Sequence, residues 1–249
     1  MAHEKLTIGL ILPDVLGTYG DDGNALVLRQ RARMRGMNAE IHPIKLGEKV
    51  PETLDVYTVG GGEDTAQILA AEHLIRDGGL TRAANAGRPV LAICAGLQVL
   101  GNSFRASGKM VDGLGLIDAT TSSLKKRTIG EVASAPTGAG MTSVLTEPLT
   151  GFENHMGATV LGKDATPLGR VTRGVGNCDE HGSSGDAAQV GVEGAVQGTV
   201  IATYMHGPAL ARNPQLADLL LAMATGQELS DLPELDLDCV NQLRKERLR

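Results

Sequence analysis

The sequence predicts an α/β fold built on a doubly wound, mostly parallel sheet. In the first hundred residues, short apolar runs alternate with helical patterns, as in successive βαβ units. The apolar run at 89–93 ends on Cys94 and passes at once into a helical pattern at 95–100. Ligands of such sheets bind outside the carboxyl ends of the strands, so we expect the functional site at that edge.

The first strand is predicted over 6–12, a continuous apolar run. A Gly- and Asp-rich loop covers 13–24, and Asn24 is a candidate cap for a helix that extends to about Arg35. A second strand is predicted over 39–44.

A third strand, over 54–59, ends on three consecutive glycines at 60–62. Asp64 stands three residues before Gln67, a spacing like that of a capping box, and the helix that begins there breaks near residues 78 and 79. The strand that leads to Cys94 comes next. The glycines and Cys94 both lie at carboxyl ends of strands, so we expect them to share one crevice.

The second half has a different pattern. Short β-rich segments punctuated by glycine cover 114–205, and the polar stretch 172–190 is predicted to be a surface loop. A helix is predicted over 214–224, and a helical tail over about 230–249 is acidic first and basic last, which suits the helix dipole. No linker divides the chain, so a single domain over 1–249 is expected.

Composition and charge exclude several classes of protein. A net charge of −6 argues against nucleic-acid binding, and no run is long and apolar enough to span a membrane. The start lacks the apolar segment of a signal peptide. Three cysteines, at positions 94, 178 and 239, form neither a disulfide framework nor a CxxC pair. A cytoplasmic protein is therefore expected.

Cys94 is the first candidate catalytic residue. A thiol at a strand-to-helix turn has the geometry of a nucleophile elbow, and the N–H groups at the helix start favour its thiolate. A His-Gly turn at His206 follows a second strand far downstream and supplies a candidate base. The alternative for Cys94 is a small apolar core residue.

Five segments of the chain resemble class I glutamine amidotransferase domains of the cobyric acid synthase type. They are LPDVLGTYGDDGN at 12–24, GGGED at 60–64, AICAGLQ at 92–98, GFENH at 151–155 and YMHGP at 204–208. The cysteine elbow with a distant histidine is shared by the whole superfamily. The Thr-Tyr-Gly-Asp loop and the His-Gly-Pro turn resemble its GatD branch more narrowly. The resemblance covers about residues 6–225. It implies a flavodoxin-like fold and an enzyme that hydrolyses L-glutamine without a cofactor.

The resemblance also implies roles for individual residues. Cys94 attacks the carboxamide carbon of glutamine, His206 passes the thiol proton to the leaving ammonia, and water resolves the thioester. The implied oxyanion donors are backbone N–H groups at Gly61, Gly62 and Ala95.

Two further residues are candidates for holding the substrate. Gln98 lies one helical turn after Cys94 on the same face, and a structurally satisfied glutamine is the alternative. Arg127, in the basic run at 125–127, matches the glutamine-binding arginine of the GatD branch, and a solvated loop is its alternative. His155 is interpreted as structural and left outside the catalytic set.

The turn at His206 departs from the wider superfamily. Many class I amidotransferases carry His-x-Glu, in which the glutamate orients the imidazole, whereas here the residues are His206-Gly207-Pro208. Another residue of this chain orients the histidine, a partner does so, or the site works as a dyad. The sequence leaves these three possibilities open.

The remaining cysteines are assigned no chemistry. The run at 178–181 holds one Cys, two acids and one His, an incomplete set of metal ligands, so no metal is expected. Cys239 is expected to pack in the last helix.

Ammonia released into water is protonated and lost, so a glutaminase of this kind supplies an ATP-dependent ligase. The sequence contains no GxxxxGK[ST] motif, so the ligase is expected to be a separate protein. By resemblance it is a MurT-like Mur ligase subunit, and the heterodimer converts D-glutamate of lipid II to D-isoglutamine in peptidoglycan synthesis. Candidate docking surfaces, each otherwise a solvated face, are the arginines at 29, 31, 33 and 35 and the tail at 232–249.

Two alternative functions remain. One is a glutaminase for another ligase, such as cobyrinate amidation. The other is a catalytically silent regulatory or scaffold subunit. Intact Cys94 and His206 count against the second, and the missing carboxylate keeps it open.

Overall fold

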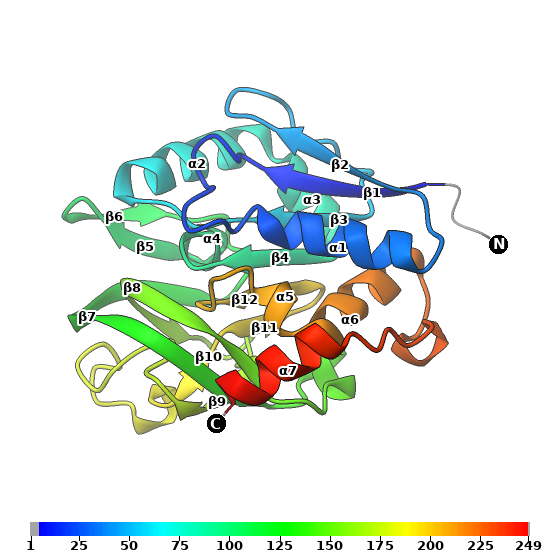
Figure 1. Cartoon of the computed structure of the whole chain (residues 1–249). Helices are drawn as coiled ribbons and strands as arrows, with labels where there is room; N and C mark the ends of the chain where they lie inside the picture. The colour runs from blue at the N-terminus through cyan, green and yellow to red at the C-terminus, as the bar shows by residue number, and fades with distance from the viewer. Residues whose placement is uncertain (1–4, 249) are drawn as a thin grey trace.

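The first of two sheets is mostly parallel. The computed structural model describes residues 5–248, and its first sheet has the order β11-β12-β4-β3-β1-β2 with only β11 antiparallel (Figure 1). Its strands are β1 (Leu6–Ile11), β2 (Ala39–Ile44), β3 (Val56–Val59), β4 (Val90–Ile93), β11 (Ala195–Gln197) and β12 (Val200–Thr203). The central strands β3, β4 and β12 are buried along their whole length, which explains why their residues are apolar apart from Thr58 and Thr203. The predicted α/β class and parallel sheet are confirmed.

Helices cover this sheet. They are α1 (Gly23–Met34), α2 (Asp64–Asp77), α3 (Gly79–Asn85), α4 (Ala95–Leu100), α5 (Ala209–Arg212) and α6 (Pro214–Thr225). The last helix, α7 (Asp238–Arg247), packs against α5 instead. In Figure 1 α1 crosses in front of the sheet and α3 lies behind it. The connections β1-α1-β2 and β3-α2-α3-β4 therefore cover opposite faces, as in a doubly wound sheet.

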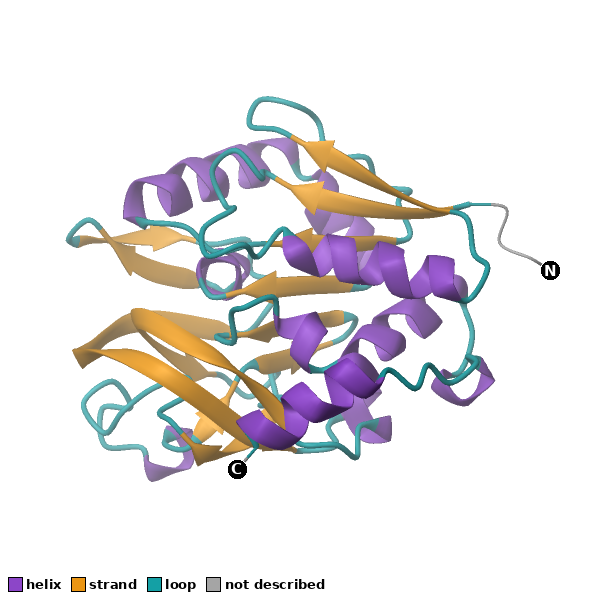
Figure 2. Cartoon of the chain, in the orientation of Figure 1, coloured by secondary structure: helices purple, strands orange, loops and turns teal. Residues whose placement is uncertain are grey.

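The second sheet is mostly antiparallel, and its two longest strands form the ribbon at the lower left of Figure 2. It has the order β10-β9-β7-β5-β6, with β8 also paired to β7. Its strands are β5 (Ser103–Ala106), β6 (Lys109–Asp112), β7 (Ala119–Pro136), β8 (Leu149–Leu161), β9 (Gly169–Arg173) and β10 (Val192–Glu193). The sequence predicted short segments here, but β7 and β8 run for 18 and 13 residues. They form one long ribbon whose polar stretches face solvent.

Two predicted helix caps are wrong. Asn24 lies inside α1, where its side chain donates to the Asp21 carbonyl and accepts from the N–H of Leu210. The Asp64 carboxylate accepts the N–H of Ser107, and Gln67 donates to the Gly62 carbonyl. Asn24 and Asp64 thus bond to segments distant in the chain, whereas Gln67 bonds to a carbonyl five residues before it. Gly78, in the left-handed conformation, ends α2 as predicted.

The basic face of α1 is not a free docking surface. Arg31 and Arg35 both pair with Asp218 of α6, at 2.6 and 2.8 Å, and their side chains are 7% and 1% exposed. Both the docking and the solvated interpretations are therefore wrong for these two arginines. The pairing joins α1 to α6.

The tail also contacts its own chain. In the described part, which excludes Arg249, a 3-10 turn at Leu229–Asp231 precedes α7. Arg244 of α7 donates to the carbonyl oxygens of Arg212 and Pro148. Cys239 is exposed rather than packed, because it lies on the solvent side of α7.

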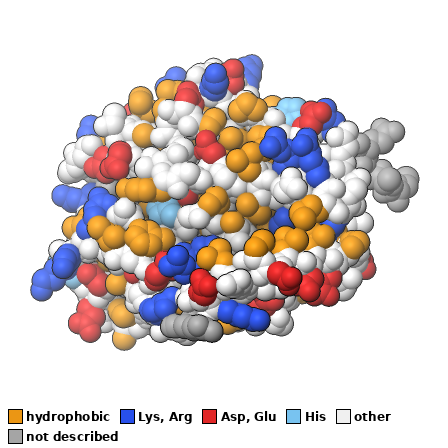
Figure 3. Space-filling model, in the orientation of Figure 1, with side chains coloured by type: hydrophobic (Ala, Val, Ile, Leu, Met, Phe, Trp, Pro, Cys, Tyr) orange, Lys and Arg blue, Asp and Glu red, His pale blue; other side chains and the backbone are white. Residues whose placement is uncertain are grey.

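The surface combines charge of both signs with apolar side chains. On the face drawn in Figure 3, apolar side chains form a band across the middle, with basic and acidic groups interspersed around it. Within residues 5–248, no helix has the length and apolar character needed to cross a membrane.

Candidate active site

Cys94 stands at a sharp turn between β4 and α4. Its backbone has φ 52° and ψ −105°, a conformation that a non-glycine residue adopts only under constraint. The turn is closely packed two residues later, at Gly96, where a Cβ would lie 2.9 Å from the Val59 carbonyl oxygen. The turn places Cys94, 8% exposed, on the wall of a cavity. The nucleophile-elbow geometry predicted for Cys94 is present.

The glycines after β3 pack against the loop after β1. A Cβ on Gly60 would lie 1.9 Å from the Leu16 carbonyl oxygen, and one on Gly62 would lie 2.9 Å from the Val15 carbonyl oxygen. Gly61 pairs with Thr18 in an isolated antiparallel bridge. Only glycine allows this approach, which holds the loop at 13–22 beside Cys94.

His206 follows β12 and lies beside the elbow because β12 and β4 are neighbouring parallel strands. The Cys94 N–H donates to the Thr203 carbonyl at 2.8 Å, and the His206 N–H donates to the Phe152 carbonyl of β8 at 2.9 Å. Nε2 of His206 is buried and forms no hydrogen bond of ordinary length with any described residue; Cys94 is the ionisable group beside it. Such contacts are often long before substrate binds.

The carboxylate of Asp21 orients the other side of the imidazole. Nδ1 of His206 lies 3.0 Å from both oxygens of Asp21, which is 2% exposed. Sequence reasoning assigned no role to Asp21, although it stands in the Thr-Tyr-Gly-Asp run. Its position in the loop after β1, at the same sheet edge as Gly60 and Cys94, could have made it a candidate. Asp22 has the same position, so the sequence could not have distinguished the two.

Packing of Pro208 helps to position Asp21 beside His206. A Cβ on Gly23 would lie 2.2 Å from Cγ of Pro208, so the His-Gly-Pro turn packs directly on the start of α1. The buried Asn24 side chain accepts the N–H of Leu210 at 3.0 Å. The proline that replaces the usual acid therefore helps to hold the loop that carries Asp21.

The charge state of His206 reflects its neighbours. Burial by itself lowers the pKa of His206, but the hydrogen bond with Asp21 and the adjacent Cys94 raise it to about 10. This direction favours the charged imidazolium form of His206. Tyr19 stands edge-on over the imidazole, with ring centroids 4.9 Å apart.

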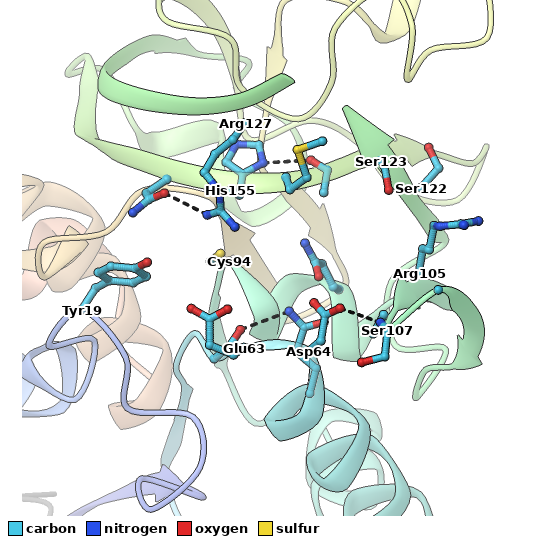
Figure 4. A pocket seen from close by; sticks show the side chains of 18 residues that line it. Tyr19, Glu63, Asp64, Cys94, Arg105, Ser107, Ser122, Ser123, Arg127 and His155 are labelled. Atoms are coloured by element: carbon cyan, nitrogen blue, oxygen red, sulfur yellow. Dashed lines mark hydrogen bonds between the residues drawn. The ribbon is translucent and has the colours of Figure 1, made fainter. Parts of the chain in front are cut away.

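A cavity of about 190 Å³ opens in front of Cys94 (Figure 4). Its wall includes one oxyanion candidate, Gly62, and both substrate candidates, Gln98 and Arg127. Tyr19 also lines the cavity, whereas His206 does not.

Arg127 reaches the cavity from a bulge in β7. The pairing of β7 with β8 shifts between Ser123 and Thr128, so residues 124–127 stand opposite Met156 alone. The guanidinium is exposed and donates to Oδ1 of Asn154 at 3.0 Å. In Figure 4 it points down toward Cys94, whereas the solvated-loop alternative has it point away.

Gln98 belongs to a buried polar network. Its Nε2 donates to the hydroxyl of Tyr204 at 3.0 Å, and that hydroxyl lies 2.7 Å from Oγ1 of Thr159. Gln98 also lines the cavity, so the structural and substrate-holding interpretations apply to the same side chain.

His155 stacks on Tyr204, with ring centroids 3.7 Å apart. Burial lowers the pKa of His155 to about 4, so the ring is neutral at pH 7 and its Nδ1–H donates to the Gly157 carbonyl at 2.8 Å. These contacts match a structural histidine at the cavity wall.

The three predicted oxyanion donors differ in availability. The Gly61 N–H already donates to Oδ2 of Asp21 at 2.9 Å, so the structure does not leave it free. Within residues 5–248, the N–H groups of Gly62 and Ala95 have no acceptor. Ala95 is the first residue of α4, where an N–H has no partner inside the helix.

The segment at 178–181 holds its loop in place through hydrogen bonds to neighbouring segments. The Cys178 thiol donates to the Gln189 carbonyl at 3.1 Å, and the Asp179 carboxylate accepts the N–H groups of Lys125 and Gly182. Cys178 is 1% exposed and packs with Leu124 and Ala158, so the predicted surface loop is partly buried. No cluster of three or more His, Cys, Asp or Glu side chains suited to a metal occurs in the described chain.

Solved structures share this fold. A glutamine amidotransferase of Thermotoga maritima superposes with a TM-score of 0.51 and 14% identity, over 98% of this chain and 94% of that one. The glutaminase domain of Trypanosoma brucei CTPS superposes with a TM-score of 0.54 and 11% identity, over 94% of this chain and 98% of that one. The predicted amidotransferase fold is confirmed.

Sequence relatives are closer. The GatD subunit of the glutamine-hydrolysing lipid II isoglutaminyl synthase of Staphylococcus aureus is 35% identical over 89% of this chain and 85% of that protein. The GatD subunit of the Streptococcus pneumoniae enzyme is 34% identical over 88% of this chain and 80% of that protein. The cobyric acid synthase of Sphingopyxis alaskensis is 32% identical over 74% of this chain but 34% of its own length.

The family assignment rests on the length of the match. The model of the CobB/CobQ-like glutamine amidotransferase domain matches residues 7–214, which include the Asp21 loop, the Cys94 elbow and the His206 turn. The resemblance expected from the five segments is thereby confirmed. This chain belongs to the CobB/CobQ-like glutamine amidotransferase family.

Proposed function

We propose that this chain is the glutaminase subunit of a lipid II isoglutaminyl synthase, and that it passes ammonia to a MurT-like ATP-dependent ligase. The observation that carries the proposal is the extent of the match to the GatD subunits, which covers 85% of the Staphylococcus aureus protein. The match to a cobyric acid synthase covers 34% of that longer protein. The ligase then amidates the D-glutamate residue of lipid II.

The site residues have distinct roles in this proposal. The Cys94 thiolate attacks the carboxamide carbon of glutamine, and the oxyanion is stabilised by the N–H groups of Ala95 and Gly62. The His206 imidazolium, oriented by Asp21, gives its proton to the leaving nitrogen, so ammonia departs as the thioester forms. His206 then takes a proton from the water that attacks the thioester. Cleavage of the C–S bond releases glutamate, whose carboxyl proton goes to solvent, and leaves the Cys94 thiolate beside the His206 imidazolium.

Three features support this assignment. The strained backbone at Cys94 lifts the sulfur onto the cavity wall, Asp21 supplies the orienting carboxylate within this chain, and Arg127 presents a guanidinium for the substrate carboxylate. A catalytically silent subunit would need none of these three.

The experiment combines the chain with the Mur-ligase-like protein that co-purifies with it, lipid II, ATP and glutamine. Mass spectrometry of the muropeptide should show D-isoglutamine. With Cys94→Ala, ammonium should still support amidation, whereas glutamine should not. Co-purification with a cobyrinate-amidating ligase, or amidation by the Cys94→Ala chain with glutamine, would contradict the proposal.

A further inference from the structure

Glu63 is a carboxylate that the fold leaves unused. It occupies the N-cap of α2, where an acidic side chain normally accepts a helix N–H, yet it forms no such capping bond. Among the described residues, its side chain has no hydrogen bond or ion pair. Instead it lines the cavity, and Figure 4 shows its carboxylate pointing inward, between Tyr19 and Cys94.

The other charged groups on the cavity wall are already engaged or point elsewhere, apart from Arg127. Asp64 accepts the N–H of Ser107, and Arg105 extends away from Cys94 in Figure 4. Arg127 extends from the opposite wall, and within the described part of the chain its side chain is bonded only to the neutral Asn154. Glu63 and Arg127 thus present one negative and one positive group to the same space without pairing with each other.

This pair of charges complements a zwitterion. When the carboxamide of glutamine reaches Cys94, its α-amino and α-carboxylate groups remain at the far end of the molecule, toward the exposed side chains of Glu63 and Arg127. The α-ammonium of glutamine would pair with Glu63 and its α-carboxylate with Arg127, each through charge-assisted hydrogen bonds.

We propose that Glu63 accepts the α-ammonium group of the substrate while Arg127 binds the α-carboxylate, which makes Glu63 the residue that selects an α-amino acid amide over a simple amide. The inference rests on the proposed glutaminase function. Glu63 differs from Gln98 and Asp64 in that Nε2 of Gln98 is bonded to Tyr204 and Oδ2 of Asp64 accepts the N–H of Ser107. The Glu63 carboxylate has no bonded partner among residues 5–248.

The test compares two ligands that differ only in the ammonium group. Glutaramate is glutamine without its α-amino group. Calorimetry on the Cys94→Ser chain measures binding without turnover, and Glu63→Gln is introduced in that background. The matched control is Glu72→Gln, an exposed glutamate of α2 outside the cavity.

Glu63→Gln should weaken glutamine binding about 10- to 100-fold and leave glutaramate binding unchanged, since only glutamine carries the ammonium group. Glu72→Gln should change neither. The melting temperature should stay constant because the Glu63 side chain has no bonded partner among the residues that the structure describes. Equal weakening of both ligands, or no weakening of glutamine, would overturn the role of Glu63. Failure of the unsubstituted chain to hydrolyse glutamine, and of the Cys94→Ser chain to bind it, would instead reject the proposed function.

Discussion

Asp21 and His206 are 185 positions apart in the chain, and their side chains meet at 3.0 Å behind the Cys94 cavity. A carboxylate accepts hydrogen bonds only, so the shared proton belongs to Nδ1, and Nε2 is directed to the thiol side. The same carboxylate accepts the N–H of Gly61. One buried acid thus fixes both the imidazole and the glycine loop.

Asp21→Asn should lower kcat for glutamine by up to about 10⁴-fold, because an orienting carboxylate sets the tautomer and stabilises the imidazolium. The measurement is steady-state ammonia release by the chain alone and with its ligase. Asp22→Asn is the matched control, since Asp22 is adjacent but not bonded to His206. Full recovery of the Asp21→Asn rate on adding the ligase would show that the partner supplies the carboxylate.

An electrophilic glutamine analogue should label Cys94 and no other cysteine. Cys178 is buried, whereas Cys239 is exposed, so a general thiol reagent should modify Cys239 and serves as the control for access. Peptide mass mapping identifies the modified residue. Cys94→Ser should abolish both labelling and ammonia release, because a hydroxyl is a far weaker nucleophile at neutral pH. Analogue found on Cys239 would count against recognition by the cavity.

Arg127→Ala should raise KM for glutamine about 10- to 100-fold with a small effect on kcat, because the guanidinium contacts the substrate in ground and transition states alike. Initial rates over a range of glutamine concentrations separate the two constants. Lys126→Ala is the control, since Lys126 shares the β7 bulge but does not line the cavity. An unchanged KM would return Arg127 to the solvated-loop interpretation.

Glu193 should make the stability of the fold depend on pH. Its Oε1 accepts hydrogen bonds from Thr203 and Tyr204, while Oε2 is buried and has no hydrogen-bond partner among residues 5–248. Burial raises the pKa of Glu193 to about 7 from 4.5. The folded state therefore binds more protons than the unfolded state between these values, so the free energy of unfolding falls as pH rises through that window.

Glu193→Gln should remove this fall, which amounts to a few kcal/mol at about 1.4 kcal/mol per pKa unit. Denaturant titrations of both proteins at pH 4.5 to 8 measure it. The difference in free energy of unfolding between the two proteins should change with pH between the two pKa values and become constant above about pH 7. A difference that is constant with pH would show that Glu193 does not titrate there.

Much of the fold follows from local pattern. The apolar runs of β1, β3 and β4 and the breaks at Gly60 and Gly78 are local signals, because a parallel strand buried on both faces must be apolar throughout. The antiparallel ribbon of β7 and β8 carries a weaker signal, since its polar stretches face solvent and its bulge depends on the partner strand.

The sequence by itself determined the α/β class, the strand-to-helix turn at Cys94 and the distant His-Gly-Pro turn at His206. Those features depend on residue type within a few positions. Only the tertiary structure decided which acid meets His206, that the Gly61 N–H is already taken, and that Arg31 and Arg35 bind Asp218 instead of facing solvent. Each of these is a contact between segments far apart in the chain, whose geometry depends on how helices and loops pack across the sheet rather than on any local spacing.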